Sequence, residues 1–152
     1  MGYELAKVST EPDWQAYHAL RRRVLWEARG RHDYDATRPE ELAVSNHPLL
    51  LKLDARPIGT TRLDNLEDGR GIVRLVAIAA DLQRQGHGRV LSRLVDDYAQ
   101  RLGISTLLVN AAPDATGYYE KMGWHACIWD EVELTGVASG AKQMVKTIGR
   151  TC

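Results

Sequence analysis

Apolar and polar residues alternate in "YELAKVS" near the start of the chain, and this period of two predicts a strand. Thr10 then supplies a helix N-cap, with Pro12 in the first turn and Asp13 three residues after the cap. Apolar side chains recur at helical spacing from there on, while the arginines at 21–23 fall largely outside the stripe. The stripe consists of Trp14, Tyr17, Leu20, Val24 and Leu25. The pattern predicts a helix with one buried face.

Residues 28–45 are charged and weakly periodic, and a short helix is expected after Pro39. Three apolar runs follow, "PLLLKLD", "PIGTTRLDN" and "GIVRLVAIA", and clusters of turn-forming residues separate them. These runs predict an antiparallel meander of three strands.

The second half of the chain alternates between helices and strands. From Val90 a repeat of about four residues predicts a helix that ends near Gly103. "STLLVNA" predicts a strand, and "DATGYYEKM" predicts a short helix closed by Gly123. Two last strands are expected around "WHACIWDEVE" and "KQMVKTI". The order predicts one α+β domain, residues 1–152, with helices on the faces of a sheet.

Charge and cysteine content exclude several classes of protein. Lys plus Arg and Asp plus Glu both number 20, and no run of like charge suggests a site for nucleic acid or an anionic membrane. Cys127 and Cys152 make a poor disulfide framework, and the N-terminus lacks the pattern of a signal peptide. No apolar stretch is long enough to span a bilayer. We therefore expect a cytoplasmic protein.

The stretch "ADLQRQGHGRVL" joins a predicted strand to a predicted helix through two glycines, Gly86 and Gly88. The first amides of a helix have no acceptors within it and lie at its positive end, so such a turn can bind a phosphate. Glycine lets the amides approach a bulky pyrophosphate. Arg89, a cation at the unfavourable end of the helix dipole, is better placed if an anion lies nearby. The alternative is a tight turn without a ligand.

The sequence excludes two other phosphate-binding motifs. The dinucleotide fingerprint requires a third glycine where this chain has Leu91, and about twenty residues further on it has Thr106 and Leu107 in place of an acid. A Walker loop requires a Gly-Lys-Ser/Thr sequence, which does not follow.

Two motifs make the chain resemble the GNAT superfamily of N-acetyltransferases. The first is Gln83-Arg84-Gln85-Gly86-His87-Gly88 after a central strand, and the second is Asn110 at a strand end followed by "YYEKMGW" from Tyr118 to Trp124. The resemblance implies a mixed, mostly antiparallel sheet of about six to seven strands, splayed in the middle, with about four helices on its faces. It also implies acetyl-CoA as cosubstrate and a primary amine of a small molecule or a peptide as acceptor.

The resemblance also assigns roles to residues. The amides of Arg84, Gln85, Gly86, His87, Gly88 and Arg89 would bind the pyrophosphate, and Gln83 belongs to the same motif. Pantetheine would pair with Val76, Ala77 and Ile78, and the amide of Ile78 would polarise the thioester carbonyl. Asn110 would lie beside pantetheine, where two parallel strands separate. Relatives also pair two copies through edge strands near the C-terminus, so a homodimer is one implied arrangement.

The leaving thiolate needs a proton donor, and Tyr119 occupies the place of the family's general acid. An unshifted Tyr has a pKa of ~10 against ~8.5 for a thiol, so full transfer is uphill by roughly 2 kcal/mol, and strong hydrogen-bond donation would suffice in its place. Tyr118 competes for the role, because neighbouring helical positions point about 100° apart.

The acceptor must lose a proton near neutral pH, yet the sequence identifies no general base. The candidates are the acids Glu27, Asp33, Asp35, Glu40, Glu41, Asp64 and Glu67. His32 lies next to Asp33, and His125 and Cys127 lack the further ligands of a zinc site, so no metal is expected. Ser139-Gly140 lacks the spacing of a nucleophile elbow, which disfavours a hydrolase. Besides an enzyme, a module that binds CoA or acyl-CoA without turnover stays open.

Overall fold

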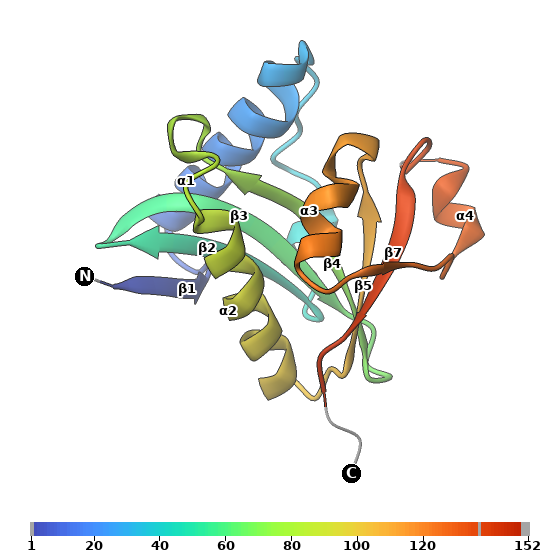
Figure 1. Ribbon diagram of the computed structural model, residues 1–152. Coiled ribbons are helices and arrows are strands. Elements are labelled where there is room, and N and C mark those ends of the chain that lie inside the picture. The colour runs from blue at the N-terminus through green and yellow to red at the C-terminus, as the bar shows by residue number, and fades with distance from the viewer. Residues whose placement is uncertain (1, 137, 150–152) are drawn as a thin grey trace.

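A seven-stranded mixed sheet forms the centre of the molecule (Figure 1). The computed structural model describes residues 2–136 and 138–149. The strands are β1 (Tyr3–Lys7), β2 (Asn46–Leu53), β3 (Arg56–Asn65), β4 (Arg70–Ile78), β5 (Thr106–Ala111), β6 (His125–Ala126) and β7 (Lys142–Thr147), in the spatial order β1-β2-β3-β4-β5-β7-β6. β4 and β5 are parallel, and the other neighbouring pairs are antiparallel. The predicted mixed sheet and its meander, now β2 to β4, are confirmed.

Helices cover both faces of the sheet (Figure 1). The described α-helices are α1 (Glu11–Arg21), α2 (His87–Arg101), α3 (Thr116–Lys121) and α4 (Glu131–Leu134). A π-helical turn, Arg22–Trp26, and a 3-10 turn, Glu27–Arg29, extend α1, and further 3-10 turns lie at Pro39–Leu42, Ala80–Leu82 and Pro113–Ala115. The larger core lies under α2 and α3, and the smaller one lies under α1. None of the described helices is long and apolar enough to cross a membrane.

The strand predicted around "WHACIWDEVE" is correct only at its start. β6 ends at Ala126, and the following segment forms α4 instead of continuing the strand. The carboxylate of Asp130 accepts the amide N–H of Val132 at 3.0 Å and so caps this helix. The cap at Asp130 therefore starts a helix where the alternation of polar and apolar residues predicted a strand. Cys152 lies outside the described residues.

β4 and β5 share a short parallel ladder that ends at the pair Val73 and Val109. Beyond it β4 remains paired with β3 as far as Ile78, but the register shifts at a bulge. Leu75, in this bulge, has a φ of 56°, a strained value for a residue with a side chain. β4 and β5 consequently separate after Val73 and Val109, and we call the opening between them the fork.

Buried ion pairs cross the sheet on the face that carries α1. Glu41, only 5% exposed, accepts hydrogen bonds from Arg21, from the Tyr17 hydroxyl at 2.8 Å and from Arg62 at 3.0 Å. Arg62 also holds Asp64 through two hydrogen bonds, at 2.7 and 2.9 Å. The sequence pattern left Arg21 off the buried stripe, and this was wrong: its guanidinium is buried because Glu41 neutralises it.

Replacing Glu41 with Gln should destabilise the fold by about 3 kcal/mol, because removing one partner of a buried ion pair leaves a charge uncompensated. Chemical denaturation measures this, with Glu40→Gln on the same turn as the control, since Glu40 is exposed and should change stability by less than about 0.5 kcal/mol.

The pH dependence of the free energy of unfolding is a second check on the role of Glu41. Burial favours the neutral form of Glu41, but Arg21, Tyr17 and Arg62 outweigh it and lower the pKa of the carboxyl. The stabilisation is therefore present above the unfolded pKa of about 4.3 and is lost as the pH falls below it. Equal stabilities of the two variants at pH 7 would contradict the account.

Candidate functional site

The turn at 83–86 is tied to the end of β4 by its own side chains. The Gln83 amide donates to the carbonyl of Ile78 at 3.0 Å, and the Gln85 amide donates to the carbonyl of Asp81 at 3.3 Å. Both glutamine side chains therefore shape the turn and leave its backbone amides to face a ligand. This geometry fits the prediction that the motif acts through its backbone.

Gly86 gives the turn its shape and its open surface. Its φ is 90°, which glycine adopts at little cost, and a Cβ placed on it would meet no described atom within 4 Å. The first bond of α2 runs from the Val90 amide to the carbonyl of Gly86 at 3.3 Å, so the earlier amides of the helix have no helical acceptor. The turn therefore offers amides and open space to an anion.

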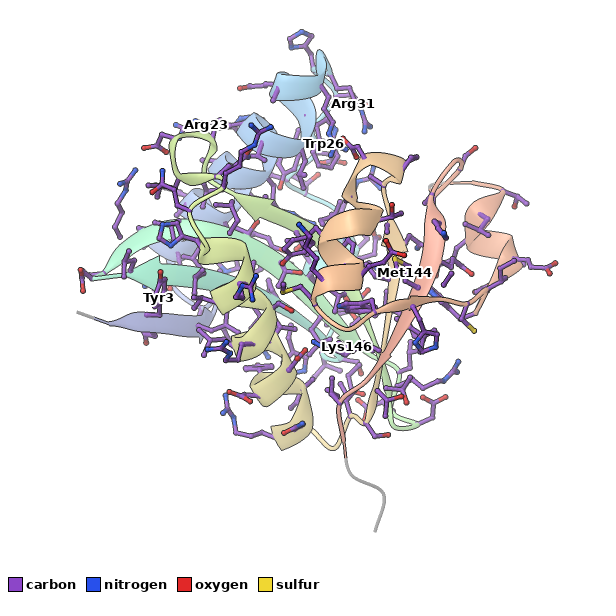
Figure 2. All side chains as sticks on the ribbon, in the orientation of Figure 1. Tyr3, Arg23, Trp26, Arg31, Met144 and Lys146 are labelled. Atoms are coloured by element: carbon purple, nitrogen blue, oxygen red, sulfur yellow. The ribbon has the colours of Figure 1, made fainter. Side chains whose placement is uncertain are left out.

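His87 opens α2 and is anchored to the first strand. The ring Nδ1 of His87 shares a hydrogen bond of 2.8 Å with the hydroxyl of Tyr3, whose side chain points from β1 toward α2 (Figure 2). This bond occupies Nδ1 of the imidazole and holds the ring against β1, while the backbone amide of His87 lies in the first turn of α2.

Gly88 has a packing reason for being glycine. A Cβ there would lie 3.2 Å from a ring carbon of Tyr118, and the Tyr118 hydroxyl donates to the carbonyl of Gly88 at 2.8 Å. Sequence reasoning explained both glycines by approach to a phosphate. The structure accounts for Gly88 by the contact between α3 and α2, and its contact with phosphate stays a prediction.

The amides of β4 face the fork at alternate residues. The Ala79 amide donates to the carbonyl of Ile58 in the β3 segment at 2.8 Å, and successive residues of a strand point to opposite sides. The amide of Ile78 therefore points away from β3, as does that of Val76. Two donors on one strand edge are available for a chain that lies in the fork.

Tyr119 lies on the face of the fork covered by α2 and α3. It lines a narrow cavity there together with Val76 and Val73, and it packs edge-on against Tyr118 and Trp124 at 5.1 and 5.4 Å between ring centroids. Burial raises the pKa of Tyr119 well above its ordinary value, so the phenol stays protonated at neutral pH. Its hydroxyl bonds to none of residues 2–136 and 138–149, which leaves it free to donate.

Tyr118 is committed elsewhere. Burial raises its pKa to about 12, and its hydroxyl is already bound to Gly88. Of the two tyrosines that the sequence left in competition, Tyr119 is the one whose proton is not used within the described structure.

The opposite face of the fork is polar and joins both strands. Arg74 and Asn110 each follow a residue of the last ladder pair, and Glu133 of α4 binds both. The carboxylate of Glu133 accepts two hydrogen bonds from Arg74, both at 3.0 Å, and one from the Asn110 amide at 2.7 Å. The carbonyl oxygen of Asn110 accepts a hydrogen bond from Gln143 at 3.0 Å. Asn110 thus lies at the opening of the fork, and its place beside pantetheine stays a prediction.

Sequence reasoning missed Arg74 and Glu133. The signal was an arginine in the middle of the apolar run "GIVRLVAIA", since a charged residue in a buried strand needs a partner. Nothing in the sequence pointed to Glu133, because the alternating pattern around it predicts a strand rather than the helix α4.

The candidate bases fall into two groups. Glu27, Asp33, Asp35, Glu40 and Glu67 are exposed, and so is His32. The pKa values of Asp33 and Asp35 are lowered by hydrogen bonds from Arg31 and Thr37, respectively. Glu41 and Asp64 are buried against arginines. A lowered pKa or an arginine partner makes a carboxylate a weak base, so the structure does not favour any of the paired acids for this role.

The segment that follows α1 carries an aromatic cluster. Trp26 packs edge-on against Tyr34, the ring of His18 contacts Tyr34, and the guanidinium of Arg31 lies 5.0 Å from the centre of the Trp26 ring (Figure 2). The π-helical turn that presents Trp26 is a backbone form often found at functional sites. Within the described ranges, no group of three or more His, Cys, Asp or Glu residues could hold a metal ion.

Known proteins resemble this chain in sequence and in fold. Residues 27–146 match the family described as the acetyltransferase (GNAT) domain. The fold is similar to that of an acyl-CoA N-acyltransferase from Pseudomonas aeruginosa, with 18% identity, a TM-score of 0.78 and coverage of 96% of this chain and 99% of the other. A PaiA N-acetyltransferase from Thermoplasma acidophilum, solved with coenzyme A, has 15% identity and a TM-score of 0.74, with 97% and 99% covered.

A third similar structure belongs to a longer chain. N-acetylglutamate synthase from Neisseria gonorrhoeae, complexed with coenzyme A and N-acetyl-glutamate, has 18% identity and a TM-score of 0.77. The match covers 99% of this chain and 36% of that one. At such identities the structural matches show the shared fold alone.

Replacing Gly88 with Ala should cost about 1 kcal/mol or more, because the new methyl group would push against the Tyr118 ring, which its hydrogen bond holds in place. Thermal and chemical denaturation measure the change. Gly117→Ala, in α3, is the matched control: a Cβ there meets no described atom within 4 Å, and it should stabilise the helix slightly. If both variants gained stability, the packing role of Gly88 would be refuted.

Proposed function

The chain belongs to the GNAT family of acetyltransferases, and from that premise we propose that it moves the acetyl group of acetyl-CoA to a primary amine. The acceptor is a small molecule or a peptide, and the whole chain, residues 1–152, works as one domain in the cytoplasm. The observation that carries the proposal is the fork, which has a turn rich in free amides at the end of β4 and the unbonded hydroxyl of Tyr119 on one face.

The residues present fit acetyl-CoA. The backbone from Arg84 to Arg89 would hold the pyrophosphate, supported by the open space over Gly86. The edge of Val76, Ala77 and Ile78 would pair with pantetheine as an added strand, and the amides of Val76 and Ile78 point to that side. The thioester end would then lie near the bulge, since the pyrophosphate lies at the far end of the same strand.

Acetyl-CoA supplies an activated acetyl group and a thiolate leaving group. An amide N–H of β4, from Ile78 or its neighbour Val76, would stabilise the negative charge that develops on the carbonyl oxygen. Tyr119 would donate a hydrogen bond to the departing sulfur. Because burial raises the pKa of Tyr119 further above that of a thiol, hydrogen bonding rather than complete proton transfer is its role.

Gly86→Val should weaken acetyl-CoA binding at least tenfold, because the side chain strains the turn and covers its amides. Calorimetry with acetyl-CoA and with dephospho-CoA measures this. Gly103→Val at the other end of α2 is the control, since Gly103 also has a positive φ, 82°, and open space around it. Unchanged binding in Gly86→Val would mean that the glycine serves only to form a tight turn and that the turn does not bind the pyrophosphate.

Tyr119→Phe should bind acetyl-CoA with unchanged affinity but transfer acetyl about a hundredfold more slowly, because the variant keeps the ring and loses the proton donor. Binding is measured by calorimetry and transfer by release of free thiol. Tyr118→Phe is the matched control and should have a much smaller effect on kcat. Normal turnover by Tyr119→Phe would exclude the acid role, and wild-type binding without any transfer would favour a CoA-sensing module.

A further inference from the structure

One ion pair on the polar face of the fork differs from the others. Arg74 and Glu133 have side chains 27% and 21% exposed, whereas Arg21 and Glu41 are 3% and 5% exposed. Glu133 comes from a four-residue helix, α4, whose apolar Val132 points to solvent. The pair is therefore the accessible end of an otherwise buried network.

The pair lies where the acceptor must arrive. Arg74 directly precedes the bulge at Leu75, and the thioester of the proposed function would lie beside that bulge. Tyr119 and the two helices α2 and α3 occupy the other face of the fork. An amine that approaches the thioester from the polar face meets the Arg74–Glu133 pair.

The charges of this network balance. Arg21 binds Glu41, Arg62 binds Glu41 and Asp64, and Arg74 binds Asp64 and Glu133, which gives three cations and three anions. A cationic acceptor that displaced Arg74 from Glu133 would leave a partly buried guanidinium with only a share of Asp64, which also pairs with Arg62. An anionic acceptor would leave Glu133 without its cation. Either loss is costly because both side chains are partly buried.

We propose that the acceptor is zwitterionic, with its carboxylate bound to Arg74 and its ammonium bound to Glu133. The proposal rests on the proposed function and names its substrate class: free amino acids and related compounds that carry an amine and a carboxylate close together. Insertion of such a molecule exchanges one ion pair for two and leaves no charge unpaired. The two parallel N–H groups that now hold Glu133 have the geometry that a substrate carboxylate requires.

This exchange of ion-pair partners also makes Glu133 available as the general base for the acceptor amine, which the sequence did not identify. Hydrogen bonds from Arg74 lower the pKa of Glu133 in the closed pair. Once a substrate carboxylate takes Arg74, the oxygens of Glu133 that held the guanidinium are open to the ammonium, and Glu133 accepts the proton that leaves the nitrogen as it attacks. The amine attacks the thioester carbonyl, the N–C bond forms and the C–S bond breaks. The second proton of the nitrogen goes to the thiolate, and Glu133 returns its proton to water.

The test compares each of several amino acids with its own amide, which keeps the amine and removes the carboxylate. Acetyl transfer gives a ratio of kcat/KM values, and calorimetry on the CoA complex gives binding without turnover. In the wild-type protein we expect the best amino acid to exceed its amide by roughly tenfold or more, as expected for a charged hydrogen-bonded pair.

Variants separate recognition from stability. Arg74→Gln should abolish the preference for the carboxylate, and Arg74→Lys, which keeps the charge without the paired geometry, should retain part of it. Glu133→Gln should keep the preference in binding and lower kcat. The control is Arg70→Gln at the start of β4, because Arg70 forms an exposed pair with Asp68 of the preceding turn, and this variant should leave the ratio unchanged.

Amides that bind and react as well as amino acids, or a ratio that Arg74→Gln does not change, would overturn the inference. If the CoA complex acetylates only amines that lack a carboxylate, the inference fails and the transferase function stands. If acetyl-CoA does not bind at all, the proposed function itself fails. Calorimetry of amino acids against the protein alone then shows whether Arg74 still selects a carboxylate.

Discussion

The separation of β4 from β5 is the constraint on which the site depends. The two strands are held together by a parallel ladder that ends at Val73 and Val109. A bulge with Leu75 at positive φ then keeps β4 on β3 and withdraws it from β5. A sheet normally satisfies its backbone groups strand by strand, and here one edge is left without a partner inside the sheet. That edge is the natural place for an extended ligand.

The two faces of the fork have different chemistry because different elements cover them. On one face α2 and α3 meet through the contact of Tyr118 with Gly88, and the ring of Tyr119 packs edge-on against that of Tyr118. On the other face charged side chains extend from α1 to α4, and their mutual neutralisation lets them be buried. An apolar side that carries the Tyr119 phenol and a charge-balanced side thus meet at the same opening.

Elements governed by local rules could be predicted from the sequence. Thr10 caps α1, Gly123 closes the short helix α3, and Gly86 lies in the turn that joins β4 to α2, each for reasons visible in a few neighbouring residues. The buried network could not be predicted, because its partners lie far apart in the chain and only the folded sheet brings them together. Glu133 is the extreme case, since the local alternation around it suggested a strand while the Asp130 cap directed a helix.

Backbone amide exchange reports on the fork itself, because backbone groups rather than side chains would hold acetyl-CoA there. Exchange is followed by nuclear magnetic resonance with and without saturating acetyl-CoA. We predict slowed exchange at Val76 and Ile78 and at the turn from Gly86 to Arg89, with the outer edge at β1 unchanged. Exchange that does not change along β4 and the turn, with protection elsewhere in the chain, would contradict the account.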